Sequence, residues 1–273
     1  MEEIKVAAVV MRSAVGKPWE NLARMEIFVR QAAFQGARVV CFPEMNITGY
    51  SLRQSMSSFA ETIPGPSTEI VLKMAQDNGL LILAGLAERK SPGEVFISHF
   101  AAGPEGLLGV YRKLHLGPPE ERIYQAGSEL MVLHYGRIPF GIELCFDAHF
   151  PELSTLLALK GAEVIFIPHA SPRESSREKR ERWLRYLSAR AYDNSLFVVA
   201  CNQVGESESG LAFSGTALVL SPRGEIMAVK DEADEGIIYA DLRETVLKEV
   251  RENHRGFFLR RRRPELYKEL ALS

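Results

Sequence analysis

A short pattern that occurs twice is the sequence feature that most constrains the fold. Residues 36–44 read Gly-Ala-Arg-Val-Val-Cys-Phe-Pro-Glu, and residues 161–169 read Gly-Ala-Glu-Val-Ile-Phe-Ile-Pro-His. Each copy joins a glycine typical of a helix end to an apolar run typical of a buried strand, which a proline then interrupts. The repeat predicts two similar halves, with Glu44 and His169 at corresponding strand ends. Chance recurrence is the alternative, because such small apolar strings are common.

The rest of the chain alternates between apolar runs and helical periodicities, which is typical of a layered α/β fold. Strands are predicted at residues 4–11, 37–42, 80–86, 95–101, 107–112, 130–135, 164–168, 196–202, 216–220, 225–229 and 236–240, with one more running into Cys145. Helices are predicted at residues 19–36, 67–78, 153–160 and 174–194. No linker-like segment divides residues 1–273, so we expect a single domain that ends in a polar tail from about residue 242.

Composition argues against several classes of partner and site. The formal net charge of −2 gives no general attraction to nucleic acid or membranes. No apolar run approaches the ~20 residues that a membrane span needs. Cys41, Cys145 and Cys201 are odd in number and widely spaced, which favours a reducing cytoplasm over a disulfide framework. The six histidines show no metal-ligand spacing, so no metal site is expected, and we interpret the basic run Arg260–Arg263 as a solvated tail or a subunit contact.

Cys145 is the first candidate for chemistry. It ends an apolar strand at an abrupt corner, and Pro151-Glu152 is typical of the helix start that follows. A thiol at such a corner lies beside free backbone N–H groups, which favour negative charge. A cysteine at a strand end can equally be a small core residue. Its interpretation therefore depends on the other polar residues at strand ends.

Glu44 and Lys113 also follow predicted strands, and ligands of open α/β sheets bind at the carboxyl ends of strands. If the three side chains meet, a carboxylate can take the proton of the thiol, and an ammonium can favour the thiolate. The ammonium and the Phe146 backbone N–H can then stabilise an oxyanion. These residue types indicate acyl transfer at a carbon–nitrogen bond through a thioester that water hydrolyses.

Motifs around these three residues resemble those of the nitrilase (carbon–nitrogen hydrolase) superfamily. The matching segments are Phe42-Pro43-Glu44 with Asn46-Ile47-Thr48-Gly49-Tyr50, then Tyr111-Arg112-Lys113-Leu114-His115-Leu116, then Cys145-Phe146-Asp147-Ala148-His149-Phe150-Pro151-Glu152, and the ending Arg263–Tyr267. The resemblance spans nearly the whole chain. It implies an α/β fold in the form of a four-layer α-β-β-α sandwich, no cofactor or metal, and a homodimer or larger homo-oligomer. It also implies that Glu44 is the base, Lys113 the stabiliser of thiolate and oxyanion, and Cys145 the nucleophile.

A second glutamate is implied by the same resemblance. Many members carry one in the loop after the lysine, a few residues before an aromatic-x-x-Gly sequence. Residues 120–127, Glu-Glu-Arg-Ile-Tyr-Gln-Ala-Gly, resemble that loop. Spacing back from Gly127 favours Glu120 as a fourth catalytic residue, with Glu121 as the alternative.

The residues around the nucleophile suggest the substrate class. Phe146-Asp147 is similar to the amidase and carbamoyl-amide branches, whereas nitrilases typically place Trp-Glu after the cysteine, so we expect a small linear amide or N-carbamoyl amine as substrate, with ammonia released. We assign substrate binding to Phe146, Glu143, His169 and Arg173. Glu143 stands where an apolar residue is expected; it either needs a partner in the core or faces the pocket and reads a polar or cationic substrate.

Other interpretations stay open at this stage. His149 could pair with Cys145 as in papain-like enzymes, although their cysteine signature is absent and a structural histidine is favoured. A nitrilase proper is the second enzymatic interpretation, and a catalytically silent binding or scaffold protein is the third. The apolar residues of the tail, among them Phe257, Phe258 and Tyr267, require cover that a second subunit could supply.

Overall fold

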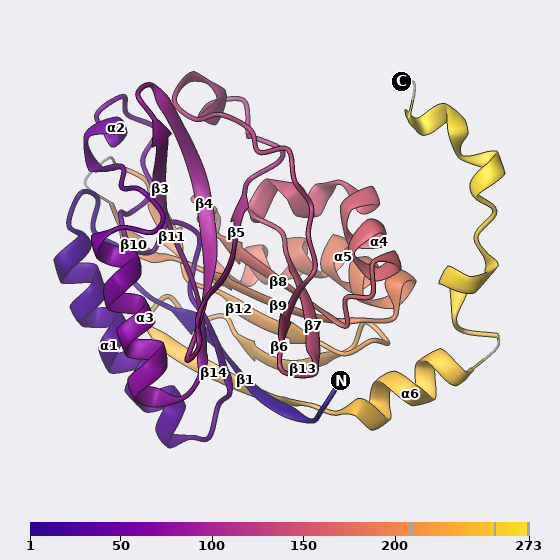
Figure 1. Cartoon of the computed structure of the whole chain (residues 1–273). Coiled ribbons are helices and arrows are strands. Elements are labelled where there is room, and N and C mark those ends of the chain that lie inside the picture. The colour runs from indigo at the N-terminus through magenta and orange to yellow at the C-terminus, as the bar shows by residue number, and fades with distance from the viewer. Residues whose placement is uncertain (208–209, 254, 272–273) are drawn as a thin grey trace.

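Two six-stranded sheets face each other in the computed structural model, which describes residues 1–207, 210–253 and 255–271 (Figure 1). The first sheet has the strand order β14-β1-β2-β3-β4-β5 and the second β13-β12-β9-β8-β7-β6. The first comprises β1 (Ile4–Val10), β2 (Val39–Cys41), β3 (Leu81–Ser91), β4 (Glu94–Gly103), β5 (Gly106–Arg112) and β14 (Gly236–Leu242). The second comprises β6 (Leu133–Tyr135), β7 (Ile138–Ile142), β8 (Val164–His169), β9 (Phe197–Asn202), β12 (Ala217–Leu220) and β13 (Ile226–Lys230).

Helices cover the outer faces of both sheets and complete four layers (Figure 1). The helices are α1 (Pro18–Phe34), α2 (Met56–Phe59), α3 (Pro66–Asn78), α4 (Pro151–Leu159), α5 (Ser176–Asn194) and α6 (Glu244–Glu252). Alternation along β1 shows how the layers form, because Val6 and Ala8 pack between the sheets whereas Ala7 and Val9 pack towards α1 and α3. A third apolar cluster lies between the second sheet and the helices α4 and α5. The predicted α-β-β-α sandwich is therefore confirmed.

The two halves repeat one topology, as the twin sequence pattern predicts. In the first sheet β2 pairs in parallel with β1 and β3, and in the second β8 pairs in parallel with β7 and β9. Parallel neighbours require crossover connections, which are α1 and α3 in one half and α4 and α5 in the other. Glu44 follows β2, and His169 is the last residue of β8, so the two lie near corresponding strand ends.

Several elements differ from the sequence-based prediction. The β3–β4 hairpin extends beyond residue 86, where the predicted strand ended because Glu88 and Arg89 interrupt the apolar run. Glu88 is nevertheless buried, since it accepts hydrogen bonds from Ser98 and Arg112. A two-stranded sheet of β10 (Val204–Glu206) and β11 (Ala212–Ser214) lies in a segment where no strand was predicted. Short 3-10 helices, which the sequence did not predict, complete the structure: η1 (Glu120–Arg122), η2 (Cys145–His149), η3 (Phe258–Arg261), η4 (Pro264–Leu266) and η5 (Lys268–Ala271). Such short elements have no hydrophobic period to reveal them.

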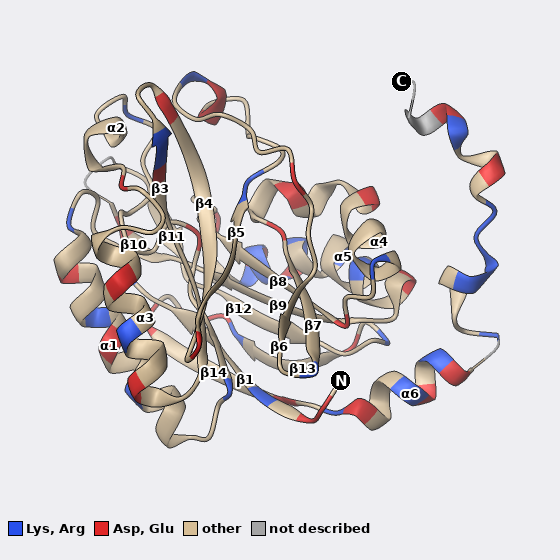
Figure 2. Cartoon of the chain, viewed as in Figure 1, with Lys and Arg blue, Asp and Glu red and all other residues tan. Residues whose placement is uncertain are grey.

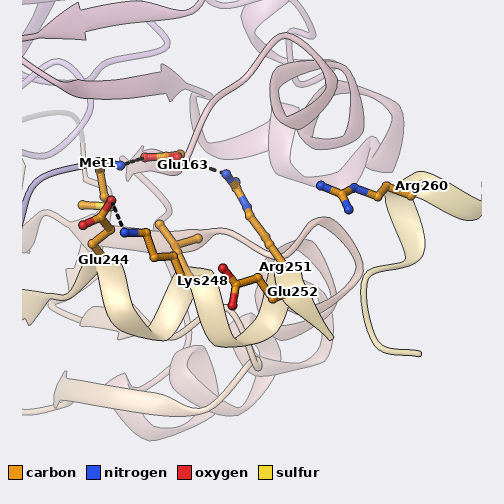
Figure 3. A pocket seen from close by; sticks show the side chains of 8 residues that line it. Met1, Glu163, Glu244, Lys248, Arg251, Glu252 and Arg260 are labelled. Carbon is orange, nitrogen blue, oxygen red and sulfur yellow. Dashed lines mark hydrogen bonds and ion pairs between the residues drawn. The ribbon is translucent and has the colours of Figure 1, made fainter. Parts of the chain in front are cut away.

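The tail predicted from about residue 242 begins with α6, which an ion pair between Arg251 and Glu163 connects to the sandwich (Figure 3). The Glu163 carboxylate forms ion pairs with the Met1 amino group at 2.6 Å and with the Arg251 guanidinium at 3.0 Å. A surface cavity of about 340 Å³ lies beside these ion pairs, and none of the predicted catalytic residues lines it.

After α6 the chain runs along one side of the molecule, outside the four layers, and carries a cluster of basic residues (Figures 1 and 2). Phe258, Leu266 and Tyr267 are exposed there by 40%, 60% and 39%. The partner subunit expected to cover them stays a prediction. Within the described ranges, no helix has both the length and the apolar character to cross a membrane.

Candidate active site

A buried lysine at the end of a strand of the first sheet lies between two buried carboxylates. Lys113 directly follows β5, and its Nζ lies 2.8 Å from Glu44 Oε1 and 2.8 Å from Glu120 Oε1. All three side chains are 5% exposed or less. Because an unpaired charge in the interior costs several kcal/mol, each of these groups depends on the others. Glu121, in contrast, is exposed, so the structure places Glu120 and not its neighbour at the lysine.

Further donors orient the two carboxylates. The Ala170 backbone N–H donates to Glu44 Oε2 at 2.8 Å, and Gln203 donates to the Glu44 backbone oxygen at 2.8 Å. Glu120 accepts the Tyr50 hydroxyl on Oε1 at 2.8 Å and the Gly117 N–H on Oε2 at 2.7 Å. Each carboxylate oxygen therefore has a fixed partner, so neither carboxylate can rotate without losing hydrogen bonds.

Cys145 is the first residue of η2, which continues into α4, so the predicted corner between strand and helix is present. Its φ of 45° is in the left-handed region, which costs a non-glycine residue of order 1–3 kcal/mol and is common at functional sites. Cys145 is partly exposed and is not disulfide-bonded. Its sulfur lies within the electrostatic reach of Glu44, Lys113 and Glu120. The structure thus brings all four predicted catalytic residues to one place.

Burial and neighbouring charge set the protonation states of this group. Dense packing, with the Glu44 and Glu120 carboxylates opposing the effect of Lys113, raises the pKa of the Cys145 thiol to about 12. Burial likewise raises the pKa of Glu44 to about 7. Burial alone would lower the pKa of Lys113, but Glu44 and Glu120 raise it above its ordinary value. At neutral pH the site therefore holds an ammonium, a neutral thiol and a glutamate close to its own titration point.

Comparison with known proteins decides the family. Residues 5–252 match the family model described as carbon-nitrogen hydrolase. The chain belongs to the carbon–nitrogen hydrolase family.

Individual relatives and a solved structure agree with this assignment. A nitrilase of Pyrococcus abyssi is 33% identical over 97% of this chain and 99% of its own. An N-carbamoylputrescine amidase of Arabidopsis thaliana is 30% identical over 92% of this chain and 89% of its own. A solved structure of an amidase variant from Nesterenkonia, with acrylamide added to its active-site cysteine, has a TM-score of 0.84 at 22% identity and covers 98% and 99% of the two chains. This last similarity shows a shared fold.

In this carbon–nitrogen hydrolase, Asp147 connects the segment around Lys113 to the segment that contains Cys145. It is fully buried and accepts hydrogen bonds from the Tyr111 hydroxyl at 2.8 Å, the His115 N–H at 2.7 Å and the Leu144 N–H at 3.0 Å. The first two donors flank Lys113, and the third precedes Cys145. From its place in the motif, Asp147 indicated only the amidase branch, although an acidic residue three positions after Leu144 has the spacing of a helix cap.

The four residues predicted to bind substrate lie in different environments. Phe146 is partly exposed next to the nucleophile, with its ring 5.7 Å from that of His149. Arg173 is exposed on the loop between β8 and α5. Glu143 is fully buried, accepts the Ser154 hydroxyl of α4 at 2.7 Å, and has its pKa raised by burial to about 8. His169 is also buried, with its ring 4.2 Å from that of Trp183.

Glu143 and His169 therefore lie in the layer between the second sheet and its helices. Of the two positions considered for Glu143, the structure shows the one in the core with a partner. Strand alternation turns Glu143 towards α4, while Ile142 packs between the sheets. His169 Nδ1 lies 2.7 Å from the Ile167 backbone oxygen. Burial lowers the pKa of His169 well below the ordinary value, so the ring is neutral.

His149 does not form the papain-like pair. Its ring lies 4.4 Å from that of Tyr186, and burial, with Arg182 and Arg190 nearby, lowers its pKa. Within the described chain, no hydrogen bond joins His149 to Cys145. Over the same residues, no group of three or more histidine, cysteine, aspartate and glutamate side chains is arranged to hold a metal ion.

Proposed function

We propose that the protein hydrolyses the carbon–nitrogen bond of a small linear amide or N-carbamoyl amine through a thioester on Cys145 and releases ammonia. The observation that carries this proposal is the buried Lys113 ammonium held between Glu44 and Glu120, within the electrostatic reach of the Cys145 thiol. Amidases among the family relatives support the substrate class, and the cysteine adduct of the Nesterenkonia amidase supports the role of the thiol.

Acylation begins with transfer of the thiol proton to Glu44. The Cys145 sulfur attacks the carbonyl carbon, and the carbonyl electrons move to oxygen, where the Lys113 ammonium and the Phe146 backbone N–H stabilise the charge. Glu44 then donates its proton to the departing nitrogen as the carbon–nitrogen bond breaks. A base with a pKa near neutrality can perform both transfers, and burial raises the pKa of Glu44 to about 7.

Deacylation reverses the roles with water in place of the thiol. Glu44 takes a proton from the water, the resulting hydroxide attacks the thioester carbonyl, and the carbon–sulfur bond breaks to release the acid. The thiolate regains the proton from Glu44. Glu120 keeps Lys113 charged throughout, since the carboxylate and the ammonium share a buried hydrogen bond of 2.8 Å.

A nitrilase proper is the second candidate, because the Pyrococcus abyssi relative named a nitrilase is 33% identical over nearly the full length. Turnover of matched pairs, each consisting of an amide and the nitrile with the same carbon skeleton, distinguishes the two. We expect faster ammonia release from the amide, with an acyl adduct on Cys145 visible by mass spectrometry after rapid quenching. Faster turnover of every nitrile in the pairs would overturn the amide assignment but not the thiol mechanism.

We expect kcat/KM to fall as the pH is lowered through about 7. Glu44 must be deprotonated to accept the thiol proton, and burial raises its pKa to about 7. Above that pH the rate should stay level to roughly pH 9, because Lys113 keeps its charge and the thiol stays neutral. Initial rates of ammonia release across this range provide the measurement. An acid limb near pH 4, the ordinary range of a glutamate, would contradict the assignment of Glu44 as a buried base.

A further inference from the structure

A second buried lysine lies on the apolar face of α5. Trp183, Leu187 and Ala191 form the face that packs on the second sheet, and Lys179 lies one turn before Trp183 on the same face. Its side chain is 0% exposed. Burying an ammonium is unfavourable unless oxygen atoms surround it, so its partners indicate what it stabilises.

Among the described residues, the acceptors of Lys179 all belong to one short loop. Its Nζ donates to the Ser171 backbone oxygen at 2.8 Å, to the Ser171 hydroxyl at 2.9 Å and to the Pro172 backbone oxygen at 3.2 Å. The Glu174 carboxylate lies 3.3 Å away and supplies the opposite charge. The lysine therefore fixes residues 171–174, which connect β8 to α5.

This loop has an unfavourable backbone conformation that needs such support. Arg173 and Glu174 both have a φ of 65°, and a left-handed conformation costs a non-glycine residue of order 1–3 kcal/mol. Asn202 holds the start of the loop by accepting the Ser171 N–H at 2.9 Å and donating to the Ser171 oxygen at 3.1 Å. The Arg173 N–H donates to the Ala212 oxygen of β11 at 2.8 Å.

The same loop reaches the proposed base. Ala170 directly precedes Ser171, and its N–H is the donor to Glu44 Oε2 at 2.8 Å. That hydrogen bond favours the ionised carboxylate, so it opposes the effect of burial on the pKa of Glu44. A shift of the loop would remove this donor and leave Glu44 held on one oxygen by Lys113.

We propose that Lys179 is a positioning residue, which holds the loop of residues 170–174 so that the Ala170 N–H orients the Glu44 carboxylate. The inference rests on the proposed role of Glu44 as general base. The charged and titratable groups that act on Lys179 are Glu174, Arg182, Cys145 and the neutral His169. Those that act on Glu44 are Lys113, Glu120, Cys145, Tyr50 and Tyr124.

Lys179→Met tests the proposal through the pH profile. Loss of one hydrogen bond to the carboxylate should move the acid limb of kcat/KM upward by about one pH unit, and so lower kcat/KM about tenfold below the limb. We expect KM to change little, because Lys179 is fully buried behind the loop. Lys179→Arg keeps the charge and should recover part of the shift. An acid limb at the wild-type pH in folded Lys179→Met would overturn the proposal and leave a purely structural lysine.

Matched variants separate this result from general damage. Arg180→Met removes the neighbouring charge on α5, which pairs with Asp231 instead of the loop, and should leave the acid limb in place. If Lys179→Met does not fold, Ser171→Ala removes one acceptor of the ammonium and should shift the limb in the same direction by a smaller amount; no shift in that variant would also overturn the proposal. Activity that survives Cys145→Ala would instead refute the proposed function itself.

Discussion

Replacing Cys145 with alanine is expected to abolish ammonia release, with a loss of about four to six orders of magnitude in kcat. The sulfur forms the bond to substrate carbon in the proposed mechanism, and the remaining Glu44 and Lys113 cannot supply a covalent intermediate. Ammonia release from the best amide substrate, measured with wild-type and Cys145→Ala protein side by side, provides the comparison. Turnover at the wild-type rate would eliminate the thiol mechanism and favour a scaffold or an unrelated site.

The other two cysteines offer a control for this experiment. Cys41 and Cys201 are fully buried between the sheets, with their sulfur atoms 3.8 Å apart. Iodoacetamide should therefore modify Cys145 alone in the folded protein and all three cysteines after unfolding. Because Cys145→Ser leaves the backbone and the size of the side chain nearly unchanged, its inactivity would show that the loss comes from the sulfur and not from a packing defect.

Replacing Lys113 with methionine should both abolish activity and destabilise the protein by about 3–5 kcal/mol, because it leaves two buried carboxylates without their cation. Glu44, whose pKa burial already raises to about 7, must then take up a proton to stay buried, so its pKa in the folded state rises further above the ~4.3 of the unfolded chain. A group with a raised folded pKa favours folding below its unfolded pKa, and this contribution is lost as the pH rises through the folded pKa. The destabilisation relative to wild type should therefore be larger at pH 8 than at pH 5.

Urea unfolding at the two pH values measures this difference. Adding Glu44→Gln and Glu120→Gln to the Lys113→Met protein removes the unpaired charges, and it should restore most of the stability and none of the activity. An equal destabilisation at both pH values would show that Lys113 contributes packing and not charge. Rescue of stability without rescue of turnover would separate the structural and chemical roles of the same ammonium.

The convergence of Glu44, Lys113 and Cys145 could be expected from sequence because all three lie at strand ends, and strand ends of a layered α/β fold meet at one rim. For the second glutamate, the resemblance favoured Glu120 over Glu121 through its spacing from Gly127, but periodicity did not distinguish the two. Both lie in a loop without periodicity, and only the three-dimensional path of η1 turns one towards Lys113 and the other to solvent. The sequence also did not indicate which face of the sheet Glu143 and His169 lie on. Their strands are buried on both faces, and the residues on the two faces are equally apolar.

The residue pattern by itself determined the twin α-β halves, because hydrophobic periodicity and turn residues act over short stretches of chain. The four-layer sandwich was expected from the resemblance of the motifs to the nitrilase superfamily. Tertiary structure alone decided which polar groups meet in the interior. The Ala170 N–H reaches Glu44 across 126 positions of the chain, and Asp147 joins loops more than 30 positions apart. No local pattern encodes such contacts. They form because a buried charge is tolerated only where packing brings opposite charge or a hydrogen-bond donor to it, and that depends on how whole layers are placed.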